Sequence, residues 1–142
     1  MKPQKVTARI ILEVMGMPKE HVEQALKDTI KKLKDDGRVR LSNAKTYETE
    51  QIEEFWSTFA EVEFEADDIK NVLDICFDYQ PSTLEILEPA GVEVDTAYLA
   101  SMFNDLLAKL HQYNAVVKNM EAEKMLMRIE IDKLSGNVPM QE

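Results

Sequence analysis

The sequence has one cysteine, one tryptophan, four glycines and five prolines in 142 residues. The lone cysteine, Cys76, cannot form a disulfide within the chain or supply a cysteine-rich metal site. So few glycines and prolines exclude collagen-like and linker-type chains. No uncharged run approaches the roughly 18 apolar residues of a membrane span, and residues 1–5 lack the apolar core of a signal peptide. These absences predict a folded cytoplasmic protein that does not enter a membrane.

The chain is acidic, with a net charge of -10, but its charges are unevenly placed. Residues 1–45 carry eleven Lys/Arg against six Asp/Glu, residues 46–100 carry one against fifteen, and residues 101–142 carry five against six. Phosphate backbones repel such a chain, which argues against nucleic acid as a partner. The acidic residues 46–100 could instead face a basic protein partner.

Recognisable catalytic motifs are also missing. The chain has no glycine-rich phosphate loop, no nucleophile elbow and no His-Glu-x-x-His zinc motif. Its two histidines, His21 and His111, have no metal-binding partner at a suitable spacing. A weak Mg²⁺ or Ca²⁺ site built from loop carboxylates stays open as an alternative. We therefore expect no catalytic residue, no cofactor and no metal site, and a protein that is not an enzyme.

The apolar pattern predicts six elements before residue 90. Apolar side chains alternate where one face of a strand is buried, and they recur every three or four residues where a helix is amphipathic. Cys76 falls on the apolar stripe of the second helix, where we expect it to be buried. The predicted order is strand 6–14, helix 18–37, strand 38–41, strand 55–64, helix 67–79 and strand 84–87.

This order predicts an α+β domain with the ferredoxin-like βαββαβ arrangement, in which both helices cover one face of an antiparallel sheet. The other face would be open. We expect its outward side chains to include Ile11, Phe55, Phe59 and Leu87. This is more apolar surface than a monomer normally exposes, so we expect another element to cover it.

The C-terminal part of the chain predicts one long helix, because neither proline nor glycine occurs between Asp95 and Gly136. Such a helix would have about 40 residues and a length of roughly 60 Å. Within it, side chains recur in alternating steps of four and three, which is the heptad pattern of a coiled coil. This heptad seam has one polar member and consists of Leu99, Phe103, Leu106, Leu110, Tyr113, Val117, Met120, Lys124, Met127, Ile131 and Leu134.

The seam is flanked by further apolar residues in its first half and by charged residues in its second half. We expect the first half to cover the open sheet face and the second half to pair with the helix of another copy. The predicted organisation is an α+β domain at 1–94, a sheet-covering and dimerising helix at 95–135 and a flexible tail at 136–142. The alternative is a helix that folds back on its own domain without a partner.

Two stretches, residues 55–64 and 76–89, resemble segments of small uncharacterised archaeal proteins with a ferredoxin-like head and a helical tail. The resemblance covers most of the chain and implies a fold but no reaction. The first 90 residues are also similar in fold to regulatory domains of the ACT type, which pair through their sheets and hold an amino acid at the interface. Those domains have a glycine-rich turn after the first strand, where this sequence has Met15-Gly16-Met17-Pro18.

The heptad seam and the missing catalytic motifs predict a non-enzymatic homodimer, an interaction or scaffold protein that pairs through its C-terminal helix. The alternative is an ACT-like regulatory module that binds a small ligand at a sheet interface.

Overall fold

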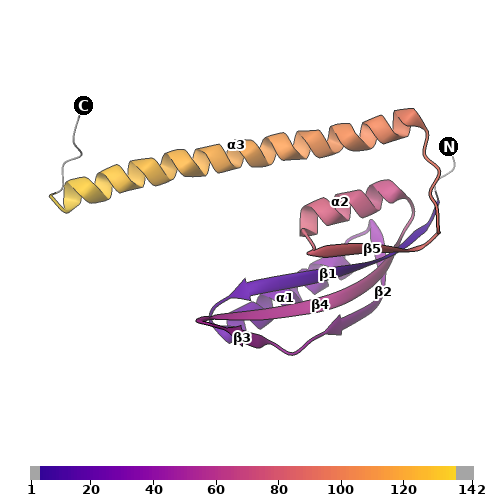
Figure 1. Cartoon of the computed structure of the whole chain (residues 1–142), viewed down its shortest axis with the longest axis horizontal. Helices are drawn as coiled ribbons and strands as arrows, with labels where there is room; N and C mark the ends of the chain where they lie inside the picture. The colour runs from indigo at the N-terminus through magenta and orange to yellow at the C-terminus, as the bar shows by residue number, and fades with distance from the viewer. Residues whose placement is uncertain (1–3, 137–142) are drawn as a thin grey trace. The chain divides into compact units, whose positions relative to one another are not determined.

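The computed structural model describes residues 4–136 and divides the chain into two units, residues 1–96 and 97–142. The first unit, called the head domain below, has five strands and two helices, and one long helix follows it. Figure 1 labels these elements. The expected flexible tail, residues 136–142, lies outside the described residues except for Gly136. The elements are β1 (Val6–Gly16), α1 (Lys19–Lys34), β2 (Val39–Thr46), β3 (Glu50–Ile52), β4 (Phe55–Ala66), α2 (Ile69–Tyr79), β5 (Thr83–Glu88) and α3 (Thr96–Leu134).

The head domain is an α+β domain with ferredoxin-like topology, as the sequence predicts. The strand order is β2-β4-β1-β5, and every neighbouring pair is antiparallel. β3 extends the sheet at one end, where it pairs with the beginning of β4.

The sequence-based prediction missed most of β2 and all of β3, and both strands pair with the outer side of β4. β2 runs to Thr46 rather than stopping at residue 41, and β3 lies within the acidic stretch 48–54, where no strand was predicted. All residues of β3, and all residues of β2 after Leu41, are exposed. Backbone pairing with β4 holds both strands in place, so no burial of apolar side chains marks them in the sequence.

Both helices cover the same face of the sheet. The even-numbered side chains of β1 from Val6 to Leu12 are 0–3% exposed and form one core cluster with side chains of both helices. α1 contributes Leu26 and Leu33 to this cluster, and α2 contributes Val72 and Ile75. Asp68 caps the start of α2, since the backbone N–H of Asn71 donates to Asp68 Oδ1 at 2.9 Å.

A polar junction joins the turn after α1 to the end of α2. Arg38 donates from Nη2 to Asp36 Oδ2 and from Nη1 to Asp78 Oδ2, both at 2.7 Å. The Tyr79 hydroxyl donates to the same Asp36 oxygen at 3.0 Å. The hydrogen bonds from Arg38 hold the pKa of Asp36 well below its ordinary value of 3.8, while burial and the Asp36 carboxylate raise the pKa of Tyr79 to about 12.

We expect Asp36→Asn to lower the free energy of unfolding by about 2 kcal/mol at pH 7, because charged hydrogen bonds are lost. Since the pKa of Asp36 is lowered by folding, its contribution is complete above pH 4 and is lost as the pH falls through the lowered pKa. Denaturant unfolding of both proteins between about pH 7 and pH 2 checks this, because their stabilities should converge in acid. A difference that does not change with pH would contradict this account.

α3 is a single helix of 39 residues, and none of them is buried. Within residues 4–136, no helix is both long enough and apolar enough to cross a membrane.

Candidate functional site

The sheet face away from α1 and α2, called the open face, changes character along β1. Directly opposed residues of antiparallel strands share a face, so the odd-numbered residues of β1 group with their partners in rows across the sheet. From one end to the other, the rows are Arg9 with Glu63 and Asn43, Ile11 with Glu61 and Lys45, Glu13 with Phe59, and Met15 with Ser57 and Glu50. The first rows contain charges of both signs, and the last rows combine apolar side chains with carboxylates and a serine hydroxyl.

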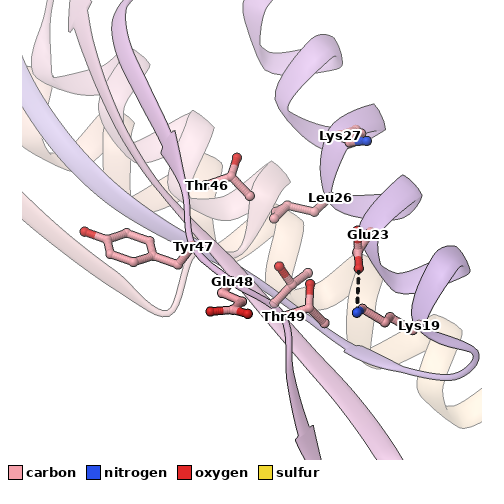
Figure 2. Close-up of a pocket in the computed structure, with 9 residues that line it drawn as sticks. Lys19, Glu23, Leu26, Lys27, Thr46, Tyr47, Glu48 and Thr49 are labelled. Carbon is pink, nitrogen blue, oxygen red and sulfur yellow. Dashed lines mark ion pairs between the residues drawn. The ribbon is translucent and has the colours of Figure 1, made fainter.

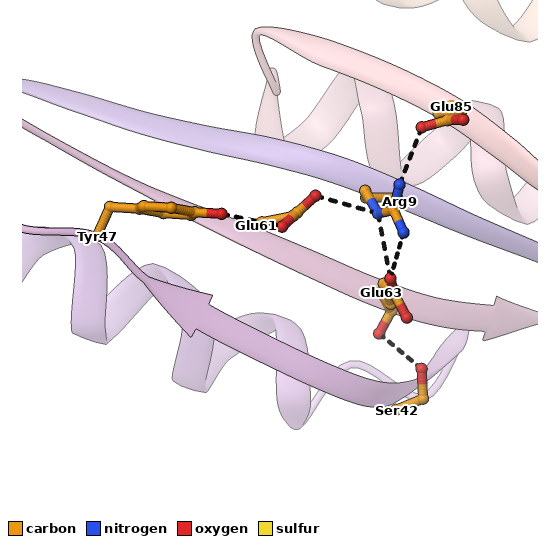
Figure 3. A network of polar contacts seen from close by, with 6 residues as sticks. All are labelled: Arg9, Ser42, Tyr47, Glu61, Glu63 and Glu85. Carbon is orange, nitrogen blue, oxygen red and sulfur yellow. Dashed lines mark hydrogen bonds and ion pairs between the residues drawn. The ribbon is translucent and has the colours of Figure 1, made fainter.

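Arg9 is the centre of the first rows, as Figure 3 shows. Its Nη2 lies 2.7 Å from Glu63 Oε1, its Nε lies 3.1 Å from Glu61 Oε1, and its Nη1 lies 3.1 Å from Glu85 Oε2. The hydrogen bond to Glu63 and the charges of all three carboxylates raise the pKa of Arg9. One guanidinium therefore joins β1 to β4 and to β5.

A second ion-pair group lies beside it. Arg40 Nη2 is 2.7 Å from Glu65 Oε1 and 2.9 Å from Asp67 Oδ1, and Lys5 also contacts Glu65 at 3.6 Å. The hydrogen bond from Arg40 lowers the pKa of Glu65. These contacts offset much of the negative charge of residues 61–67 within the head domain itself.

At the opposite end of the open face, the carboxylates Glu13 and Glu50 have no ion pair with a residue of the range 4–136. Ile52 lies directly opposite Phe55, and Met15 lies one row away opposite Ser57. Met15, Met17, Ile52 and Phe55 are 55%, 59%, 47% and 36% exposed, respectively. Phe59 stacks on Tyr47 with ring centroids 4.5 Å apart in the adjoining row.

The four side chains expected on the open face lie in different environments. Ile11, in the row of Glu61, and Phe59, in the row of Glu13, are half-buried, and Phe55 is exposed beside the turn between β3 and β4. Leu87 lies where the pairing of β5 with β1 shifts register, and it is half-buried. The cluster of Arg9 with three carboxylates was not predicted from the sequence, because the partners are 52 to 76 residues away along the chain.

A cavity of about 220 Å³ lies on the other side of the sheet, between α1 and the segment that joins β2 to β3 (Figure 2). Side chains of both charge signs line it together with three threonines, and Lys19 Nζ lies 3.9 Å from Glu23 Oε1. This cavity was not predicted from the sequence, because its lining residues come from three separate parts of the chain. The lining residues are Lys19, Glu23, Leu26, Lys27, Thr46, Tyr47, Glu48, Thr49 and Thr58.

The predicted seam residues of α3 remain accessible. Leu106 is half-buried, and the other ten are exposed. Among the exposed apolar side chains of the seam, Leu99 has the smallest exposed fraction, 37%, and Leu134 has the largest, 84%. The seam therefore forms a row of exposed apolar side chains, interrupted only by Lys124.

The remaining reactive side chains lie apart from one another. His21 and His111 are exposed, one on α1 and the other on α3. Cys76 is half-buried rather than fully buried, and desolvation raises the pKa of its thiol. Among the described residues, no group of three or more His, Cys, Asp or Glu side chains is placed to hold a metal ion.

The fold and these surfaces define the class of protein, an α+β ferredoxin-like head domain followed by a long C-terminal helix. A model of the MJ0538 family matches residues 7–135, from β1 to the residue after α3, and the chain therefore belongs to the MJ0538 family. No curated protein and no solved structure shows a match to this chain.

We expect Arg9→Gln to lower the melting temperature at pH 7, because Glu61, Glu63 and Glu85 would be left close together without their shared cation. Added salt should reduce the loss by screening the repulsion among the carboxylates. Thermal unfolding at low and high ionic strength checks this. Lys27→Gln is the matched control, since Lys27 is exposed and has no ion pair with a described residue, and a similar loss there would contradict the role given to Arg9.

Proposed function

We propose that the protein is a non-enzymatic homodimer, an interaction or scaffold protein whose two copies pair through α3. The single observation that carries this proposal is the accessible heptad seam along the whole of α3. Exposure of an apolar row of this length to water is unfavourable. The same helix of a second copy has a matching row, and pairing of the two helices would bury both rows.

The spacing of the seam favours a coiled coil over packing on a flat surface. A seam with a 3.5-residue period drifts by about 20° per heptad on a straight helix of 3.6 residues per turn. Over five heptads the drift is roughly 100°, so a flat surface could contact only part of the seam. A partner helix that winds around α3 can follow the seam from end to end.

The residue types along the seam favour two parallel helices. The a positions are Phe103, Leu110, Val117, Lys124 and Ile131, and the d positions include Leu99, Leu106 and Leu134. Two of the five a residues, Val117 and Ile131, are β-branched and three of the six d residues are leucine, a combination that favours parallel dimers, and the single polar a residue restricts the number of helices and their register. In this arrangement Glu123 of one chain can reach Arg128 of the other, a contact worth a few tenths of a kcal/mol.

We expect Met120→Glu to weaken the dimer by at least about tenfold in dissociation constant, because it places a carboxylate at a d position of each helix. Met125→Glu is the matched control, because it makes the same substitution on the other side of α3 and the two methionines are 62% and 67% exposed. Light scattering coupled to size exclusion checks both variants. Equal effects, or a wild-type monomer at tens of micromolar, would contradict pairing through the seam.

A second form of the same experiment uses a chain that ends at Leu110 and therefore lacks the later heptads. We expect this chain to be monomeric. A truncated chain that remains dimeric would place the interface in the head domain or in the first half of α3.

A second candidate function is the binding of a small ligand, and the cavity beside α1 is the observation that favours it. Its size is below the range of about 300–1,000 Å³ that is usual for drug-sized ligands. Lys27 and Glu48 line the cavity together with threonine hydroxyls, a set that suits a small zwitterion such as an amino acid. This cavity lies on the helix side of the sheet, whereas the ACT-like alternative predicts a site at a sheet interface.

Thermal unfolding in the presence of individual amino acids tests this second function, since a ligand that binds only the folded chain raises the melting temperature. At a hundred times the dissociation constant, the ligand adds about 2.7 kcal/mol to the free energy of unfolding. Lys27→Met should reduce this shift, and Lys34→Met, at the exposed end of α1, should not. No shift with any amino acid would count against the cavity as a binding site.

A further inference from the structure

The end of the open face beside the turn between β3 and β4 combines exposed apolar side chains with carboxylates that form no ion pair with a described residue. We define the hairpin patch as Met15, Met17, Ile52 and Phe55 together with Glu13, Glu50, Glu53 and Glu54. In Figure 1, the end of β1 and the turn between β3 and β4 lie at the same end of the head domain. The registers agree, because Gly16 lies opposite Trp56 and Ile52 lies opposite Phe55.

The apolar part of the patch spans three neighbouring strands. Phe55 on β4 has Ile52 beside it on β3, and Met17 is the next residue after β1 on the other side. Met15 follows in the next row, opposite Ser57. Neighbouring strands are about 4.8 Å apart, so this surface is about as wide as the apolar face of one α-helix.

The four carboxylates of the patch are available to a partner. All four are exposed, and none makes an ion pair with a residue in the described part of the chain. Glu13 accepts one hydrogen bond, from the Ser57 hydroxyl at 3.2 Å. At the other end of the same face, Arg9 and Arg40 pair with the carboxylates around them. The hairpin patch is therefore the part of the open face where negative charge is left uncompensated beside apolar surface.

We propose that the hairpin patch binds a basic amphipathic helix of a partner protein, with the apolar side of that helix on Met15 and Phe55 and its Lys or Arg side chains at the carboxylates. Charge complementarity selects this occupant. An acidic segment would meet four like charges, and a neutral apolar segment would leave the carboxylates partly desolvated without a partner. The proposal is independent of pairing through α3, because it uses only residues of the head domain.

The first test titrates the full chain into a fluorescently labelled synthetic peptide of leucine and lysine that forms an amphipathic helix of about four turns. A peptide with glutamate in place of every lysine is the matched control. We expect the lysine peptide to bind more tightly by at least about tenfold, with an affinity that falls as salt increases. Equal binding of the two peptides, or no binding of the lysine peptide, would overturn the proposal.

Variants then locate the binding site. We expect Glu13→Lys combined with Glu50→Lys to weaken binding of the lysine peptide by at least about tenfold. Glu20→Lys combined with Asp28→Lys makes the same change in net charge on exposed positions of α1 and should have a much smaller effect. If both double variants lose the same affinity for the lysine peptide, binding depends only on the net charge of the protein. That result would overturn the proposed site.

A neutral variant keeps the test independent of charge and of folding defects. Met15→Gln changes an exposed side chain and should weaken binding several-fold, while Met125→Gln on α3 should not.

A competition experiment tests whether the chain's own helix occupies the patch. If an unlabelled peptide of residues 96–118 displaces the lysine peptide and binds more tightly than it does, the patch belongs to the chain's own helix and the proposal is wrong.

Discussion

Burial of the even-numbered side chains of β1 is the constraint on which the rest of the head domain depends. Val6, Ala8 and Ile10 are fully buried in the core between the sheet and both helices. Because a shift of one residue would move this whole set to the open face, their burial fixes the register of β1. The same register places Arg9 between Glu63 and Glu85, and it places Met15 in the row beside Phe55. The core thus determines which charges and which apolar groups the open face presents.

The sequence predicted the elements that carry an apolar alternation or a helical spacing, and it missed β3 and the second half of β2, which are held by backbone pairing with β4. The alternation in β1 and β4 and the helical spacing of α1 and α2 were readable in the sequence, so the ferredoxin-like topology followed. β3 and the second half of β2 have no buried side chain and left no such signal. The residues of the open face were predicted from the alternation of odd and even positions along each strand. This alternation separates the two faces of the sheet, but it does not show which residues become neighbours across strands. The difference between the two ends of the open face therefore required the register.

The same distinction explains what could be known of the candidate sites. The seam of α3 is a local pattern, in which each member is three or four residues from the next, so the sequence names all of its residues. The cavity beside α1 and the hairpin patch are built from segments up to about 40 residues apart, so they emerge only once the strands are aligned. The net charge of residues 46–100 also misleads on its own, because Arg9, Arg40 and Lys5 from the basic third pair with several of those carboxylates.

The two proposed surfaces differ in whether they can pair with themselves. A two-fold interface brings the same patch of both copies together, and a seam that is apolar except for Lys124 satisfies this requirement. The hairpin patch does not, because two copies would bring eight carboxylates together around a small apolar surface. Self-association through α3 would place two hairpin patches in one assembly. A partner with two basic helices could then bind with an avidity that neither patch provides alone, provided that its helices span the distance between the heads.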